Sequence, residues 1–182
     1  MRVITGSARG RKLITLEGTD VRPTTDMVKE AMFSMIQFEV EGARVLDLFC
    51  GSGQLGVEAL SRGAAYCTFV DLSRDAQSVT RENLQATGLS KNSKVAAMDA
   101  MAFLKTTGAE FDIALLDPPY SKGLVSDALP MLADKMSESG VILCETALTD
   151  ELPETVGDFS VVKSTRYGKI KLTVYRRVQG ED

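Results

Sequence analysis

Residues 111–120 constrain the fold of this chain most, because they read as a buried strand that stops abruptly on an acid. Residues 111–116 are mostly apolar, Asp117 follows them, and Pro118, Pro119 and Tyr120 come next. Proline lacks a backbone N–H and fixes φ, so the strand cannot continue past Pro118. Ligands of open α/β sheets bind at the carboxyl ends of the strands. We therefore expect a carboxylate, a stiff turn and an aromatic ring at such an edge.

The rest of the chain alternates short apolar runs with amphipathic segments, which predicts repeated strand–helix units. We expect strands at 44–49, 65–70, 94–98, 111–116 and 141–145, and helices at about 54–62, 73–87, 101–106 and 122–137. Pro130 should kink or divide the last of these helices. Residues 159–163 and 170–175 read as an antiparallel pair. The pattern predicts an α/β fold: a doubly wound, mostly parallel sheet with antiparallel C-terminal strands.

The segment before the first of these strands predicts a short extension. Residues 3–5 and 13–16 can pair as a hairpin around a basic loop. An amphipathic helix should follow, capped by Thr24 or one of the next two residues and ended by Gly42. We expect a single domain over residues 1–182, made of an extension (1–42) and a core (43–182).

Composition excludes several kinds of chemistry. The chain has no histidine, which argues against a Ser-His-Asp triad, a histidine base or a zinc site, and we expect no metal. Its three cysteines (Cys50, Cys67 and Cys144) are far apart and odd in number, which suits a reducing cytoplasm. No apolar run approaches the ~20 residues of a membrane span. The net charge of −4 means that nucleic acid could be held only by a local basic patch.

Four acids stand at the ends of expected strands, and these ends should meet at one edge of the sheet: Asp47, Asp71, Asp99 and Asp117. After the first strand, glycines 51, 53 and 56 form a turn that opens a helix, where a ligand can lie against bare backbone. Each acid can instead cap the helix that follows it. Together with the glycine turn, the four acids favour a binding pocket.

The glycine spacing also fits a dinucleotide-binding turn, so an NAD-dependent oxidoreductase is one alternative. Asp71 lies 20 residues after Gly51, where an acid accepts hydrogen bonds from a ribose. Asp47 departs from the dinucleotide pattern, because an acid just before the turn would repel a pyrophosphate but attract an ammonium group. This favours a nucleoside that carries an amino acid. The oxidoreductase alternative also lacks a proton donor.

These motifs resemble those of the class I S-adenosylmethionine-dependent methyltransferases, which have a seven-stranded Rossmann-like sheet. Residues 47–53 match the cofactor turn, Asp71 the ribose acid, Asp99 and Ala100 the adenine contact, and residues 117–120 the (D/N)PPY signature of exocyclic-amine methylases. Residues 6–13, residues 22–33 and the pair Tyr167-Gly168 further resemble the RsmD-type 16S ribosomal RNA guanine-N2 methyltransferases. Asp71 stands where that family would have Glu.

The resemblance implies that the chain is a cytoplasmic, monomeric enzyme. Its reaction would transfer a methyl group from S-adenosylmethionine to the N2 amine of one guanine in 16S rRNA, within the small ribosomal subunit or its assembly intermediate. The catalytic residues would be Asp117, Pro118, Pro119 and Tyr120. The cofactor would be held by Asp47, Phe49, Gly51, Ser52, Gly53, Asp71, Leu72, Asp99 and Ala100, with Thr24 closing over its methionine end.

The DPPY signature suits amine chemistry. The lone pair of a guanine N2 is delocalised into the ring, so the amine is a poor nucleophile. Hydrogen bonds from N2–H to Asp117 and to a carbonyl near Pro118 would favour a tetrahedral nitrogen, while Tyr120 stacks on the base. Asp117 is also a candidate proton acceptor. Methylation of a pyrimidine carbon would need a cysteine nucleophile; Cys144 is placed for it, but a buried structural thiol is the better interpretation.

The amino-terminal loop carries three cations, Arg9, Arg11 and Lys12, which we expect to hold RNA phosphates together with Arg22 and Lys169. A solvated arm is the alternative. Two rival functions remain. Methylation of adenine N6 or cytosine N4 in DNA or RNA uses the same signature, although such enzymes usually add a target-recognition domain. A catalytically silent RNA-binding module is the other, against which intact Asp117 and Tyr120 argue.

Overall fold

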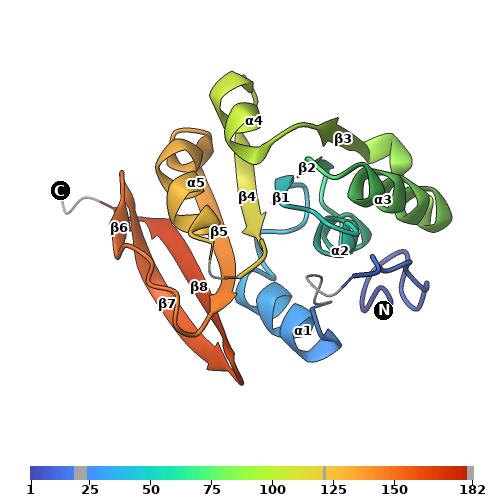
Figure 1. The fold of residues 1–182 in the computed structure, drawn as a ribbon, viewed down its shortest axis with the longest axis horizontal. Coiled ribbons are helices and arrows are strands. Elements are labelled where there is room, and N and C mark those ends of the chain that lie inside the picture. Colours follow the sequence, from blue (N-terminus) through green and yellow to red (C-terminus); the bar gives the residue numbers. More distant parts are fainter. Residues whose placement is uncertain (19–23, 121, 180–182) are drawn as a thin grey trace.

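The computed structural model describes residues 1–18, 24–120 and 122–179. They form one mixed eight-stranded sheet in the order β3-β2-β1-β4-β5-β8-β7-β6 (Figure 1). Five neighbouring strands run parallel: β1 (Arg44–Leu48), β2 (Tyr66–Asp71), β3 (Ser93–Ala97), β4 (Phe111–Leu116) and β5 (Met136–Ala147). Three antiparallel strands complete the sheet: β6 (Thr155–Val156), β7 (Phe159–Tyr167) and β8 (Ile170–Arg177). The predicted fold class is confirmed.

The eighth strand, β6, is not among the strands predicted from the sequence. It has two residues and pairs with the start of β7, in a stretch that reads as loop because Pro153 and Gly157 flank it. The strand β5 is also longer than expected, because it begins at Met136 before the register shift that precedes Val141. Neither difference alters the edge where the four acids end their strands.

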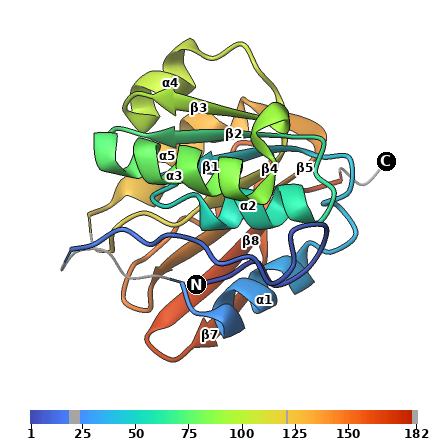
Figure 2. The same ribbon diagram turned by 90° about the vertical axis from the view of Figure 1, so that its right-hand side faces the viewer.

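The helices cover both faces of the sheet (Figures 1 and 2). On one side lie α1 (Asp26–Met35), α2 (Gln54–Ser61) and α3 (Arg74–Thr87), followed by the short turn η1 (Ser90–Asn92); on the other lie α4 (Ala100–Thr106) and α5 (Leu124–Ala133). Successive residues of a strand point to opposite faces, so Val45 and Ile113 join the core under α1 and α2, while Leu46 and Ala114 join the core under α4 and α5.

Local sequence signals set most helix ends. Thr25 caps α1, with its hydroxyl accepting a hydrogen bond from Val28 N at 3.3 Å, and Ser73 caps α3 in the same way. Gly88 ends α3 with a φ of +73°. The helix α1 ends at Met35, so the prediction that it continues to Gly42 is wrong. Gly42 instead lies in a turn, and its N–H donates a hydrogen bond to Gly63 O next to the end of α2.

The amino-terminal segment pairs with itself in a different register from the predicted one. Residues 1–3 lie against residues 10–13, with a bridge between Arg2 and Lys12 and a hydrogen bond from Leu13 N to Met1 O. The predicted pairing of residues 3–5 with 13–16 is therefore wrong. Residues 4 and 5 donate their N–H groups to the buried carboxylate of Glu58 on α2 instead, so the core of the protein decides the register.

Candidate active site

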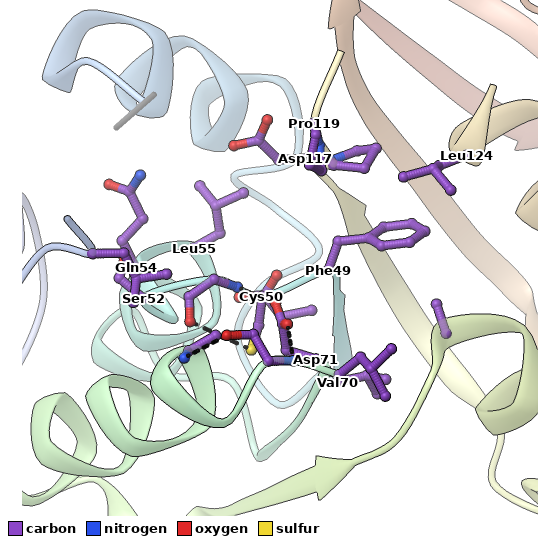
Figure 3. A pocket seen from close by; sticks show the side chains of 18 of the residues that line it. Phe49, Cys50, Ser52, Gln54, Leu55, Val70, Asp71, Asp117, Pro119 and Leu124 are labelled. Carbon is purple, nitrogen blue, oxygen red and sulfur yellow. Dashed lines mark hydrogen bonds between the residues drawn. The ribbon is translucent and has the colours of Figure 1, made fainter. Parts of the chain in front are cut away.

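A cavity of about 590 Å³ opens at the carboxyl edge of the parallel strands (Figure 3). The ends of β1, β2 and β4, the glycine turn and the start of α4 all contribute to its wall. Eight of the ten residues predicted to hold a cofactor line it: Asp47, Phe49, Gly51, Ser52, Asp71, Leu72, Asp99 and Ala100. The four residues of the DPPY signature, Asp117 to Tyr120, also line it. The structure thus brings the two predicted sets to one cavity.

The glycine turn has a backbone conformation, with positive φ, that residues with a side chain rarely adopt. Gly53 precedes α2 with a φ of +80°, and a Cβ there would lie 2.8 Å from the Thr80 side chain, so this glycine shapes the turn without lining the cavity. Phe49 has a φ of +66°, the single positive value among non-glycine residues in the described part of the chain. Such strain collects at ligand sites, where the surrounding structure holds it in place.

Asp47 lies beneath the turn and is 2% exposed. Its Oδ2 atom accepts a hydrogen bond from Gly56 N at 2.9 Å. Burial raises the pKa of Asp47 to about 8, and the nearby Asp71 adds to the effect. A cation that enters the cavity beside Asp47 would favour its charged form. The site therefore offers a carboxylate that ionises when a cation binds.

Asp71 and Asp99 hold the backbone as well as line the cavity. The Asp71 carboxylate accepts hydrogen bonds from Gly51 N and from Ser73 N, both at 2.9 Å, so it ties the end of β2 to the glycine turn. Asp99 caps α4, with Oδ2 accepting from Ala102 N at 3.1 Å. Each carboxylate oxygen has two lone pairs, so these bonds leave acceptor capacity that faces the cavity.

Glu145 was not identified from the sequence as a functional residue. It lies near the end of β5, is 3% exposed and faces Asp117, because Leu116 of β4 pairs with Cys144 of β5. A signal was present, since the fifth strand also reaches an acid at its carboxyl end. Glu145 lines a second cavity of about 240 Å³, which shares Pro118, Pro119 and Tyr120 with the first.

Four side chains connect at this point. Thr24 Oγ1 lies 2.7 Å from Asp117 Oδ2 and 3.2 Å from Glu145 Oε2. The hydroxyl of Tyr120 donates to Glu145 Oε1. Thr24 does not line the large cavity, and its hydroxyl contacts the two acids.

The two acids cannot easily both be charged. Burial, together with the neighbouring Glu145, raises the pKa of Asp117 well above its usual range. Burial likewise raises the pKa of Glu145, although hydrogen bonds from Tyr120 and Thr24 oppose the effect. Two carboxyl groups this close and this poorly hydrated share a proton near neutral pH.

The predicted RNA-binding cations lie on separate elements. Arg9, Arg11 and Lys12 are exposed on the amino-terminal loop, and Lys169 is exposed in the turn between β7 and β8. Arg22 lies outside the described residues. The loop is well anchored, because Ala8 N donates to Ser61 Oγ and Ser7 N donates to Ser61 O.

Two other kinds of chemistry, a cysteine nucleophile at Cys144 and a metal site, find no support among the residues that the structure describes. Cys144 is fully buried, lines neither cavity and has its pKa raised by burial, which favours a structural thiol. Within residues 1–18, 24–120 and 122–179, no group of histidine, cysteine and acidic side chains is arranged to bind a metal. Over the same ranges, no helix has the length and apolar character needed to cross a membrane.

Known proteins match this chain over nearly its full length. The family model described as "Conserved hypothetical protein 95" matches residues 1–176. The Escherichia coli (strain K12) protein named "Ribosomal RNA small subunit methyltransferase D" is 35% identical over 184 residues, which cover 100% of this chain and 92% of the relative. This chain belongs to the RsmD family.

Other members of the family agree in sequence and in fold. The Bacillus subtilis (strain 168) protein named "Putative rRNA methyltransferase YlbH" is 41% identical over 97% of this chain and 99% of its own length. The solved structure described as "Putative methyltransferase yhhF from Escherichia coli" superimposes with a TM-score of 0.86, at 36% identity and 97% coverage of both chains. The resemblance drawn from the motifs is confirmed.

Proposed function

We propose that the chain transfers a methyl group from S-adenosylmethionine to the N2 amine of a guanine in small-subunit (16S) ribosomal RNA. One observation carries the proposal: the DPPY signature and the glycine turn stand on the wall of the same cavity. The relatives' names support rRNA as the substrate. The amino-terminal pattern of residues 6–13 and 22–33 supports guanine N2 over other amines.

The cavity suits S-adenosylmethionine in size and in chemistry. Its volume of about 590 Å³ is within the usual range for ligand sites. Asp47 provides a carboxylate for the ammonium group, Asp71 for the ribose hydroxyls and Asp99 for the adenine amine, while Gly51 and Ser52 present backbone at the start of α2. When bound, the cofactor supplies a methyl group on a sulfonium that is already activated.

The residues of the signature position the amine. Asp117 and a carbonyl near Pro118 accept hydrogen bonds from N2–H, and the half-buried Tyr120 stacks on the base. Glu145 restrains the Tyr120 ring by accepting a hydrogen bond from its hydroxyl. Because the methyl group is already activated, holding the amine in line accounts for most of the catalysis.

The two segments of the chain have different roles. Residues 1–42 contact RNA and cover the cofactor, and residues 43–182 form the catalytic core. The cations that hold RNA phosphates are Arg9, Arg11, Lys12 and Arg22 of the extension and Lys169 of the core. The enzyme works as a monomer on the subunit or its assembly intermediate, in the cytoplasm and without a metal.

The experiment is to incubate the purified protein with S-adenosylmethionine labelled in the methyl group and one of three acceptors. These are naked rRNA, small subunits from a strain that lacks the modification, and DNA. We expect N2-methylguanine in rRNA after digestion to nucleosides. Label found only in adenine or cytosine would show that the enzyme methylates a different exocyclic amine. No transfer to any acceptor, with RNA still bound, would show a silent binding module.

A further inference from the structure

One residue in the wall of the large cavity carries a buried acceptor that lacks a donor. Gln54 is the first residue of α2, is 6% exposed and lines the cavity next to Leu55 (Figure 3). Its Oε1 atom is buried and has no hydrogen-bond partner among the residues that the structure describes. Because an unpaired buried acceptor lowers the stability of a folded protein, such an atom in a cavity wall points to a ligand that brings the donor.

The place of Gln54 distinguishes it from other buried groups of this kind. Thr146 and Thr173 also carry buried hydroxyl oxygens without a partner in the described part of the chain. Neither of these threonines lines the large cavity, whereas Gln54 does. A ligand in this cavity can therefore satisfy the Gln54 acceptor and leave the two hydroxyls as they are.

The direction of the Gln54 side chain selects one end of the cofactor. The amide points away from Asp71 and Val70, which lie at the other side of the cavity (Figure 3). Asp71 and Asp99 are the proposed partners of the ribose and the adenine, so Gln54 faces the methionine end. That end of S-adenosylmethionine carries a carboxylate, which only accepts hydrogen bonds, and an ammonium group, which donates them. The missing donor is then the ammonium group.

The surroundings of Gln54 suit both charges of an amino acid. No side chain caps α2 within the described residues, and the N-terminus of a helix favours an anion such as the carboxylate. Asp47, which accepts a hydrogen bond from Gly56 N in the same helix, offers negative charge to the ammonium group. The last side-chain torsion of a glutamine has a broad energy minimum, so the amide can turn its oxygen toward the ligand.

We propose that Gln54 binds the α-ammonium group of S-adenosylmethionine through Oε1 and makes the site selective for cofactors with a free amine. The inference rests on the proposed function and deepens it, because it names a residue that recognises the methionine end of the cofactor. Gln54 holds this group away from the sulfonium, and no bond forms or breaks at the amide.

Gln54→Met tests the contact in binding experiments. Methionine has a similar length and helix propensity but no amide. S-adenosylhomocysteine keeps the amino acid and has no methyl group to transfer, so calorimetry reports binding alone. We expect its affinity to fall about tenfold or more in the variant. Affinity for methylthioadenosine, which lacks the amino acid, should stay within about twofold of wild type. Equal losses for both ligands, or no loss for either, would contradict the proposal.

A second ligand separates the ammonium group from the carboxylate. In an analogue of S-adenosylhomocysteine whose amine is replaced by hydrogen, the carboxylate remains. Wild-type protein should bind this analogue more weakly than S-adenosylhomocysteine, and the ratio of the two affinities should shrink about tenfold in Gln54→Met. An unchanged ratio would assign Gln54 to another part of the ligand and overturn the proposal.

The melting temperature of the free protein provides a readout that needs no ligand. Gln54→Met removes an unpaired buried acceptor, so the melting temperature should rise by about 2–4 °C. Thr173→Val is the matched control, because it removes a group of the same kind outside the cavity. It should raise the melting temperature as well and leave the affinity for S-adenosylhomocysteine unchanged. A lower melting temperature for Gln54→Met would show that the amide is already paired and overturn the inference.

These measurements also keep the inference apart from the proposed function. A wild-type protein that bound neither S-adenosylmethionine nor S-adenosylhomocysteine would refute the proposed function. Binding by wild type that is unaffected by Gln54→Met would refute only the role of Gln54.

Discussion

Asp47 and Gly56 are joined by a buried hydrogen bond, with Asp47 Oδ2 2.9 Å from Gly56 N. The bond attaches the end of β1 to the first turn of α2, and its carboxylate is 2% exposed. It places an acid with a pKa of about 8 beneath the glycine turn, at the point where the proposed cofactor would bring its ammonium group. Each partner in this hydrogen bond leads to a prediction.

The pKa of Asp47 predicts that cofactor binding depends on pH. The free protein holds a proton on Asp47 below pH 8, and the ammonium group of the cofactor favours the ionised form. Binding should therefore release a proton, and affinity should rise by up to about tenfold between pH 6 and pH 7. Calorimetry in two buffers of different ionisation enthalpy measures the proton release.

Asp47→Asn supplies the control and a check that needs no ligand. A pKa raised from 3.8 to about 8 means that the folded state binds an extra proton, so wild-type stability falls as the pH rises through this range. The variant lacks the titrating group, so its melting temperature relative to wild type should increase from pH 5 to pH 8. Cofactor affinity that is independent of pH in wild type would contradict the role of Asp47.

Gly56→Ala should destabilise the fold. A Cβ at Gly56 would overlap the ring of Phe69 and lie 2.7 Å from Cys67 Sγ, because α2 packs closely on β2 at this point. We expect a loss of about 1–3 kcal/mol in the free energy of unfolding, measured in urea. Gly108→Ala is the matched control, since nothing lies within 4 Å of a Cβ there. Equal stability of the two variants would show that α2 can shift at no cost.

Glu58→Gln should loosen the amino-terminal segment. Glu58 is fully buried, accepts hydrogen bonds from Ile4 N and Thr5 N, and lies 3.9 Å from Nζ of the buried Lys29. The amide leaves the Lys29 charge without its counterion, so we expect a loss of about 3 kcal/mol in the free energy of unfolding. Faster hydrogen exchange at residues 4 and 5 would locate the effect.

The control for Glu58 is an exposed acid in an ion pair. Glu110 pairs with Arg44 at 3.2 Å on the surface, and solvent screens such pairs. Glu110→Gln should therefore change stability by less than about 1 kcal/mol. If the two glutamine variants lose the same free energy, the buried pair is not what anchors the segment.

Arg11→Glu should weaken RNA binding. Arg11 is exposed on a loop that Glu58 and Ser61 hold in place, so a phosphate contact there would be formed without ordering the loop first. We expect affinity for rRNA to fall about tenfold, with a shallower dependence on salt concentration. Filter binding at several salt concentrations measures both. Lys163→Glu, an exposed cation on β7, is the control; unchanged binding by Arg11→Glu would identify the loop as a solvated arm.

Asp117→Ala should abolish methyl transfer while cofactor affinity stays within about threefold of wild type. The reason is that the proposed contact of Asp117 is with the target amine, whereas Asp47, Asp71 and Asp99 serve the cofactor. Single-turnover assays measure methyl transfer, and calorimetry measures cofactor affinity. Lost cofactor affinity would assign Asp117 to the cofactor site.

Local sequence patterns were sufficient to predict the elements that build the cavity. The strands that end at the cavity were recognisable as short apolar runs, and Gly51, Gly53 and Asp71 have the spacing of a nucleotide-binding turn. The carboxyl ends of parallel strands share an edge, so the gathering of the four acids followed from the fold class alone. Errors occurred where distant residues compete with local preference, as at Gly42, whose partner is Gly63.

The sequence by itself determined the order of strands and helices, the acids at the strand ends and the family of the chain, because these depend on periodicity and on short motifs. Only the tertiary structure decided that Thr24, Asp117 and Glu145 meet. Thr24 is 93 residues from Asp117, and Glu145 comes beside them through the register of β4 with β5. Burial of this cluster then raises the pKa of both acids, and burial is a property of the packed molecule that no short stretch of sequence carries.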